Sequence, residues 1–313
     1  MTGRKVLATL PAAARAELEG RLPDWLEPRW FADPREALEL GADAEIGWLD
    51  MNDKRDMANA IVGATRMHWL NSMFAGIDGL PLRTLLERGV AVTNGAGLNA
   101  VTIAEYVLMG MLTIAKGYRE IVRAQERREW LADAPGKLEL AGSRALLIGH
   151  GAIGSLVHER VAAFGVDVTV ARRKPDVDAH GPGPDDWRGR LGEFDWVVLT
   201  VPATPQTKGM FGAVEIAALK PNAVLVNVGR ASVIDQAALV AALQARRIAG
   251  AFLDVTDPEP LPRRHPLLAL ENVIIAPHLG SATEQTRQKM AEISVENLRR
   301  GLAGQPLLFE VRS

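Results

Sequence analysis

The feature that most constrains the fold is a set of three glycines, Gly149, Gly151 and Gly154, spaced as Gly-x-Gly-x-x-Gly. Directly before them, Ala145 to Ile148 is a short, wholly apolar run, as is typical of a strand buried on both faces of a parallel sheet. After them, apolar residues recur at helical spacing from Ser155 to Phe164. This order of strand, glycine turn and helix favours a dinucleotide-binding unit, because the glycines admit a pyrophosphate to the helix N-terminus. An ordinary strand-to-helix turn is the alternative.

Length and composition indicate a globular protein of about two domains. The chain has 313 residues, of which 48% are hydrophobic. A net charge of −2 without blocks of like charge argues against nucleic acid or an anionic membrane as a partner. The absence of cysteine excludes disulfides, thiolate nucleophiles and Cys-ligated zinc, and we expect no metal. No apolar run reaches the roughly 18 to 20 residues of a membrane span and no signal peptide opens the chain, so we expect a soluble, cytoplasmic protein.

Short apolar runs alternate with helical patterns in two blocks, which predicts two parallel α/β domains with a cleft between them. Residues 1–98 lack a glycine fingerprint, and we assign them to a smaller, flavodoxin-like substrate domain. The expected elements there are strands at Val6 to Leu10, Ile46 to Leu49, Trp69 to Asn71 and Val90 to Thr93, and helices at Ala12 to Leu18, Pro34 to Leu40 and Pro81 to Glu87.

Residues 99–283 are predicted to form a doubly wound Rossmann domain that binds the dinucleotide. One long apolar helix, from Asn99 to Arg128, is expected to open it. A last helix within residues 284–313 is expected to return to the first domain and make that domain discontinuous. The expected strands are Ala145 to Ile148, Asp167 to Val170, Trp196 to Thr200, Ala223 to Val228, Ala249 to Leu253 and Val273 to Ala276.

The residues after the second of these strands bear on the choice of dinucleotide. In this fold an acidic residue about 20 positions past the glycines normally holds the ribose 2′-hydroxyl of NAD. Here Arg172, Arg173 and Lys174 occupy that place. Guanidinium groups suit a 2′-phosphate, so the sequence favours NADP(H), with NAD(H) as the second possibility. A solvated basic turn is the structural alternative.

Three side chains that could act together in one reaction follow three successive strands of the second block. Arg230 follows the fourth strand, Glu259 the fifth and His278 the sixth. The carboxyl ends of parallel strands share one edge of a sheet, so we expect all three beside the bound dinucleotide. A histidine can protonate a ketone, a carboxylate favours its imidazolium form, and an arginine can grip a 2-oxo acid. Taken singly, each residue also has an ordinary structural explanation.

The chain resembles the D-isomer-specific 2-hydroxyacid dehydrogenases over nearly its whole length. The segments that carry the resemblance are Ser-Met-Phe-Ala-Gly-Ile-Asp at 72–78, Gly-His-Gly-Ala-Ile-Gly at 149–154, Asn-Val-Gly-Arg-Ala-Ser-Val-Ile-Asp at 227–235, Asp-Val-Thr-Asp-Pro-Glu-Pro-Leu at 254–261 and Pro-His-Leu-Gly at 277–280. The order and spacing of these segments make the match specific.

The resemblance implies a role for each matching residue. Arg230 would bind the substrate carboxylate, His278 would be the acid and base, and Glu259 would pair with His278. It also implies a small 2-oxo or 2-hydroxy acid as substrate and a homodimer formed through the cofactor domain. The implied carboxylate site in the other domain is Ala75, Gly76 and Ile77, and the implied dinucleotide contacts are Gly149, Gly151, Ala152, Ile153, Gly154, Arg172, Arg173, Pro202, Thr207, Val228, Asp254 and Gly280, with Asp254 at the nicotinamide carboxamide.

Within the family, the two arginines and the segments 255–262 and 278–283 look like those of NADP-dependent glyoxylate/hydroxypyruvate reductases. This narrower resemblance implies NADPH-dependent reduction of glyoxylate-like or hydroxypyruvate-like acids to D-2-hydroxy acids. One departure is Ala231, where the family usually has glycine, and its methyl group is expected to narrow the backbone approach beside Arg230.

Two other functions stay open at this point. One is a dehydrogenase of another small anion, such as formate or phosphite, although formate enzymes of the superfamily carry glutamine where Glu259 stands. The other is a non-catalytic dinucleotide sensor, like the transcriptional co-repressors of the family. Those proteins keep the arginine, glutamate and histidine, so only a turnover measurement separates them.

Overall fold

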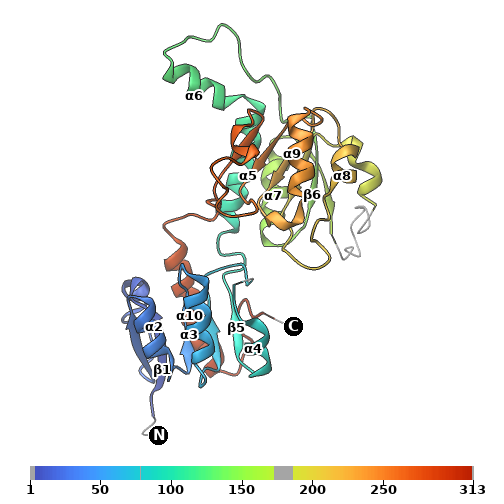
Figure 1. Ribbon diagram of the computed structural model, residues 1–313. Helices are drawn as coiled ribbons and strands as arrows, with labels where there is room; N and C mark the ends of the chain where they lie inside the picture. The colour runs from blue at the N-terminus through green and yellow to red at the C-terminus, as the bar shows by residue number, and fades with distance from the viewer. Residues whose placement is uncertain (1–3, 78, 173–185, 312–313) are drawn as a thin grey trace. The chain divides into compact units, whose positions relative to one another are not determined.

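The computed structural model describes residues 4–77, 79–172 and 186–311, which form two compact units (Figure 1). The first unit contains Met1–Asn99 and Thr283–Ser313, and the second contains Ala100–Ala282. Each unit is built on one sheet whose paired strands all run parallel. The prediction of two parallel α/β domains is therefore confirmed.

Within the described residues, the sheet of the first unit has five strands in the order β2-β1-β3-β4-β5. The chain steps from β1 to β2 on one side and then to β3, β4 and β5 on the other, which is the flavodoxin-like order. The strands are β1 (Val6–Pro11), β2 (Leu26–Phe31), β3 (Ile46–Gly47), β4 (Trp69–Asn71) and β5 (Ala91–Thr93); the helices are η1 (Ala12–Ala14), α1 (Arg15–Leu18), α2 (Pro34–Gly41), α3 (Lys54–Gly63), α4 (Leu82–Glu87) and α10 (Thr286–Leu302).

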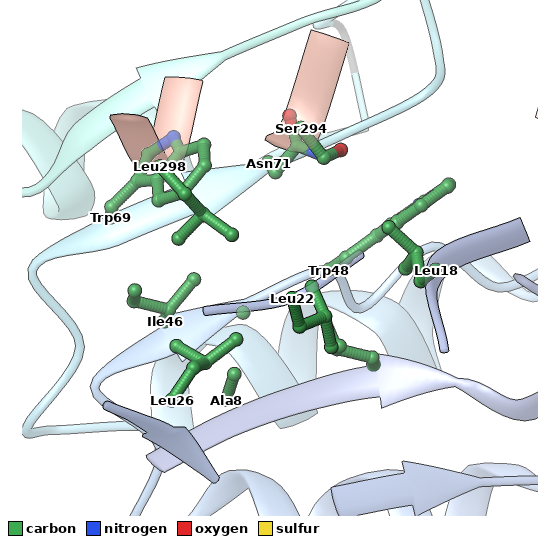
Figure 2. Close-up of a pocket in the computed structure, with 12 residues that line it drawn as sticks. Ala8, Leu18, Leu22, Leu26, Ile46, Trp48, Trp69, Asn71, Ser294 and Leu298 are labelled. Carbon is green, nitrogen blue, oxygen red and sulfur yellow. The ribbon is translucent and has the colours of Figure 1, made fainter. Parts of the chain in front are cut away.

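The last helix, α10, packs into the first unit. Its buried apolar residues join the core that contains Ala8, Trp48 and Trp69, and Asn71 Nδ2 donates a hydrogen bond to Ser294 Oγ at 2.7 Å. Figure 2 shows a small apolar pocket at this junction, with Asn71 and Ser294 side by side at one end. The two ends of the chain therefore build one core.

The second unit has six strands, within the described residues, in the order β11-β10-β9-β8-β6-β7. Each of the six strands predicted for this unit is confirmed to within one residue at each end. The strands are β6 (Arg144–Ile148), β7 (Asp167–Ala171), β8 (Trp196–Leu199), β9 (Val224–Asn227), β10 (Gly250–Leu253) and β11 (Val273–Ile275); the helices are α5 (Ala100–Ala115), α6 (Tyr118–Glu126), α7 (Ala152–Ala163), η2 (Arg188–Glu193), α8 (Ala213–Ala218), η3 (Ala231–Val233), α9 (Gln236–Gln244) and η4 (Pro266–Ala269).

The prediction of one helix from Asn99 to Arg128 is wrong, because α5 and α6 are separate and bent by 69°. Gly117 ends the first helix in a left-handed conformation, with φ of +62°. A Cβ at Gly117 would lie 2.8 Å from the backbone of Pro135 and Gly136, so a returning segment packs into the break. Among the described residues no single helix is long and apolar enough to cross a membrane, and α5 with α6 meets those criteria only as a bent pair.

Gly110 sets the distance between α5 and the sheet, which gives a test of this packing. A Cβ there would lie 2.5 to 2.8 Å from ring carbons of Phe252, so we expect Gly110→Ala to destabilise the protein by about 1–3 kcal/mol. Gly63 is the last residue of α3, and a Cβ there would lie 3.9 Å from the nearest atom, a side-chain carbon of Leu38. Gly63→Ala is therefore expected to leave the midpoint of thermal unfolding unchanged or to raise it. Thermal unfolding followed by circular dichroism measures both. Equal midpoints for the two variants would contradict the close packing.

Candidate active site

The glycine turn between β6 and α7 is fixed by contacts with the end of β8. Gly149 has φ of +102°, and a Cβ there would lie 2.8 Å from Thr200 Oγ1. The Thr200 hydroxyl donates to the carbonyl oxygen of Gly149 at 3.0 Å. A Cβ at Gly154 would lie 2.2 Å from that same oxygen. The protein itself therefore requires glycine at positions 149 and 154.

Gly151 is different, because nothing among the described residues requires glycine there. Its φ of −86° suits any residue, and no atom of the described residues lies within 4 Å of an added Cβ. Gly151 caps the N-terminus of α7, whose first residues, Ala152 and Ile153, have backbone N–H groups without helical partners. A phosphate group of a dinucleotide fits this position, since a missing side chain lets it approach these N–H groups.

The end of β7 lies beside this turn. Ile148 pairs with Ala171, and the backbone N–H of Gly149 donates to Ala171 O at 3.0 Å. Arg172, the next residue, therefore lies next to the glycine turn. Arg173 lies outside the described residues.

The loop after β8 and the end of β9 form the neighbouring part of the same edge. Thr207 Oγ1 donates to Pro202 O at 2.6 Å and accepts from the Thr204 N–H at 2.8 Å, which closes the loop on itself. Val228 extends the pairing of β9, with its N–H donating to Leu199 O at 3.2 Å. These contacts place Pro202, Thr207 and Val228 in loops at the carboxyl edge of the sheet, next to the point where the strand order reverses.

Arg230 follows β9 in a sharp turn at residues 227–230, which we call the Asn227 corner because the Asn227 side chain stabilises it. The Asn227 side chain accepts from the Gly229 N–H at 3.0 Å and donates to Arg230 O at 3.1 Å. A Cβ at Gly229 would lie 2.5 Å from Val201 O, so the close backbone approach at this corner is made by Gly229. Ala231 begins the short helix η3.

His278 and Glu259 are hydrogen-bonded to one another. His278 Nδ1 lies 2.8 Å from Glu259 Oε2, and Glu259 Oε1 accepts from the Thr256 N–H at 3.0 Å. The two side chains are 48% and 39% exposed, so a ligand can reach them. His278 also has a left-handed backbone with φ of +56°, which is uncommon for a non-glycine residue.

Asp254 holds the turn that carries His278. Its carboxylate is buried and accepts hydrogen bonds from the N–H groups of Leu279 and Gly280, at 2.9 and 3.1 Å. Burial raises the pKa of Asp254, and these two hydrogen bonds oppose that shift. A Cβ at Gly280 would lie 2.6 Å from Asp254 Oδ2, so a side chain at position 280 would break the arrangement.

The three strands that precede Arg230, Glu259 and His278 are β9, β10 and β11, which are adjacent in the sheet. The three side chains therefore leave one edge of the second unit in succession. Ala75, Gly76 and Ile77 lie in the first unit, in the loop after β4. The sequence does not single out Asp50, whose side chain binds the start of that loop.

A sequence model for the D-isomer specific 2-hydroxyacid dehydrogenase NAD-binding domain matches residues 108–280. The chain belongs to this family. The matched span contains the glycine turn, Arg230, Glu259 and His278. The second unit is therefore the NAD-binding domain of a 2-hydroxyacid dehydrogenase.

Similar proteins agree with this assignment. The glyoxylate reductase/hydroxypyruvate reductase of Homo sapiens is 33% identical over 324 residues, which cover 98% of each chain. Glyoxylate/hydroxypyruvate reductase B of Yersinia pestis (strain Pestoides F) is 34% identical over 77% of this chain and 76% of that protein. The NADPH-dependent glyoxylate/hydroxypyruvate reductase of Sinorhizobium meliloti, solved with NADP and malonate, has a TM-score of 0.79 at 28% identity, covering 99% of this dehydrogenase and 97% of that chain.

Gly151 and Gly154 give a matched test of the dinucleotide site. Gly151→Ala is expected to keep the stability of the wild type but to weaken dinucleotide binding at least tenfold, because only the ligand meets its methyl group. Gly154→Ala is expected to lower the unfolding midpoint, because its methyl group collides with Gly149 O. Fluorescence titration with NADPH and NADH, together with thermal unfolding, separates the two effects. Unchanged affinity in Gly151→Ala would remove this turn from the site.

Proposed function

We propose that the protein reduces small 2-oxo acids of the glyoxylate and hydroxypyruvate type to D-2-hydroxy acids, with NADPH as the preferred reductant. The observation that carries the proposal is the His278–Glu259 pair, held by the buried Asp254 turn one strand away from the corner of Arg230. The names of the human and Yersinia relatives support the substrate class, and that of the Sinorhizobium reductase supports the choice of NADPH.

His278 acts as the proton donor in this reaction. Glu259 engages Nδ1, so Nε2 is the ring nitrogen that exchanges a proton with the substrate. A bound reduced nicotinamide supplies the hydride that the carbonyl carbon takes up. The Nε2 proton passes to the carbonyl oxygen, the double bond to oxygen becomes a hydroxyl group, and His278 is left neutral until solvent protonates it again. Glu259 stabilises the imidazolium that exists before the transfer.

Arg230 and the loop at Ala75, Gly76 and Ile77 bind the substrate carboxylate. A guanidinium offers paired donors to a carboxylate, and the Asn227 corner limits where Arg230 can lie. Backbone N–H groups in a glycine-containing loop suit an anion in the same way. Binding the acid group orients the carbonyl toward the proton donor, which contributes to the rate by positioning alone.

Two molecules of this chain associate as a homodimer through α5 and α6. Large apolar side chains remain exposed along these helices and the segment that follows them, which is unusual for the surface of a monomer. The residues are Val101, Met109, Tyr118, Ile121, Val122 and Trp130, the last with 97% of its surface exposed.

Replacing the proton donor tests the mechanism. His278→Asn is expected to lower kcat for glyoxylate and hydroxypyruvate by roughly 10²- to 10⁴-fold, the usual contribution of a positioned acid. His68→Asn, at an exposed histidine of the first unit, serves as the control and is expected to keep wild-type turnover. The loss of NADPH absorbance measures both. Near-normal turnover in His278→Asn would remove His278 from the reaction.

The same assay separates an enzyme from a sensor. Tight NADPH binding by the wild type, without turnover of glyoxylate, hydroxypyruvate, pyruvate or phenylpyruvate, would favour a dinucleotide-sensing protein.

The basic pair after β7 tests the choice of dinucleotide. Arg172→Ala combined with Arg173→Ala is expected to weaken NADPH binding at least tenfold and to leave NADH binding nearly unchanged, because each charged hydrogen bond to a 2′-phosphate contributes about 1.5–3 kcal/mol. The matched control replaces Arg246 and Arg247, an adjacent pair that precedes β10 at the opposite edge of the sheet. Equal losses for NADPH and NADH would refute the assignment.

A further inference from the structure

Asp50 lies three residues beyond β3, at the carboxyl edge of the sheet in the first unit, and its carboxylate ties two loops together. Oδ1 accepts from Ser72 Oγ at 2.7 Å. Oδ2 accepts from the backbone N–H of Met73 and from Trp48 Nε1, the latter at 2.8 Å. Ser72 and Trp48 are fully buried. A half-buried carboxylate thus accepts three hydrogen bonds, and none of the assigned catalytic steps uses it.

The residues that Asp50 holds begin the loop at 72–77, and a second set of contacts holds the middle of that loop. The Gly95 N–H donates to Phe74 O at 3.1 Å, and Asn94 Nδ2 donates to the carbonyl of residue 75 at 2.8 Å. A Cβ at Gly95 would lie 2.1 Å from Met73 O, so the two loops lie in direct backbone contact. The loop is therefore fastened on one side by Asp50 and on the other by the segment after β5.

We propose that Asp50 is the positioning residue of the loop that binds the substrate carboxylate, an inference that rests on the proposed function. Asp50 acts through Ser72 and Met73, and it fixes the path of the backbone that presents the N–H groups of residues 75–77 to the anion. Without it, the contacts that the described residues leave to the start of the loop are the Ser72 N–H with Thr93 O, the Phe74 N–H with Ser72 Oγ, and those with residues 94 and 95.

The charge of Asp50 distinguishes this role from ordinary packing. Burial raises the pKa of Asp50 to about 6, while hydrogen bonds from Ser72, Met73 and Trp48 oppose that shift. Among the described residues, no charged side chain contributes to this shift. The nearest charged residues along the chain are Asp53 and Lys54, where Asp53 caps α3 through the N–H groups of residues 55 and 56. Three donors therefore compensate a negative charge that no cation among residues 4–77, 79–172 and 186–311 stabilises.

Removing the side chain tests the positioning role. Asp50→Ala deletes all three hydrogen bonds, and we expect its KM for glyoxylate to rise at least tenfold. The kcat is expected to fall much less, because an interaction with the acid group is made equally in the ground state and the transition state. The dissociation constant of NADPH, measured by fluorescence titration, is expected to stay within about twofold.

Asp50→Asn and Asp53→Asn are the matched variants. In Asp50→Asn the amide oxygen accepts from Met73 and Trp48 while the amide nitrogen donates to Ser72 Oγ, so we expect KM within about threefold of wild type. Asp53→Asn removes one negative charge from the same loop and keeps the helix cap, and we expect wild-type KM and stability. A KM in Asp50→Ala equal to that of wild type would overturn the proposal.

Binding of oxamate, a small acid that cannot be reduced, gives the same comparison without turnover. Calorimetric titration of the NADPH complexes is expected to show weaker oxamate binding in Asp50→Ala and near-normal binding in Asp50→Asn. A wild type that binds oxamate but reduces no 2-oxo acid overturns the proposed function, while the variants still decide the role of Asp50 by affinity. A wild type that neither binds nor reduces such acids overturns both.

The pH dependence of stability tests whether the Asp50 carboxylate is buried. A fully solvated carboxylate has the same pKa in the folded and unfolded states, so replacing it would not alter how stability changes with pH. The pKa of about 6 in the folded protein exceeds the ordinary value of 3.8, so the folded state binds the proton more tightly than the unfolded chain. Ionisation therefore costs stability, and this cost is absent below about pH 4 and complete above about pH 6. We expect the Tm of Asp50→Asn relative to wild type to rise from pH 4.5 to about pH 6 and then to stay level up to pH 7.5, with Asp53→Asn following wild type. A difference that is constant over this range would overturn the buried, charged state of Asp50.

Discussion

Parallel strand pairing is the constraint on which both candidate ligand sites depend. In a parallel sheet every crossover brings the chain back to the same end, so the segments that follow the strands gather at one edge. In the second unit that edge collects the glycine turn, the Asn227 corner and the His278 turn, which are far apart in sequence. In the first unit it collects Asp50 and the segments after β4 and β5. The functional side chains at either edge are therefore brought together by the parallel pairing of the strands.

Buried and half-buried polar side chains then shape the loops that leave these edges. Thr200, Asn227 and Asp254 each bind the backbone of a neighbouring loop and stand at, or one residue beyond, the end of a strand. Asp50 does the same in the first unit. A loop cannot satisfy its backbone groups by a regular ladder, so a side chain that accepts or donates at the right point defines its conformation. Close approaches at Gly149, Gly229 and Gly280 make these contacts possible, because no side chain separates the loops.

Elements that are buried and apolar throughout can be predicted from the sequence, whereas edge strands and charged helices cannot. Strands β8, β9 and β10 of the second unit are buried throughout, and their largely apolar runs are readable from sequence. Strand β2 was not predicted, because its sequence, Leu-Glu-Pro-Arg-Trp-Phe, belongs to the edge of its sheet and mixes proline and charge with apolar residues. Helix α3 was not predicted either; it begins with charged residues after the Asp53 cap. The helix break at Gly117 was missed because the apolar period continues across it, while the packing that bends the chain comes from residues 135–136.

The same distinction applies to the candidate site. The glycine spacing, the basic residues after β7 and the order of Arg230, Glu259 and His278 are local patterns, so the sequence suffices to propose them. Asp50 has no such pattern, because its partners Ser72 and Met73 lie more than 20 residues further along the chain. Only the register of β3 beside β4 brings them together. Sequence motifs therefore do not identify residues that position others through tertiary contacts.

The return of α10 to the first unit has a consequence for the synthesis of the chain. The hydrogen bond between Asn71 and Ser294 joins residues 223 positions apart, and four of the buried residues in that core belong to the last helix. The second unit is continuous and can complete its core before α10 is synthesised, whereas the first unit must wait for that helix. During that interval the apolar face around Trp48 and Trp69 lacks its cover, so the nascent amino-terminal part is the portion most exposed to chaperones and to aggregation.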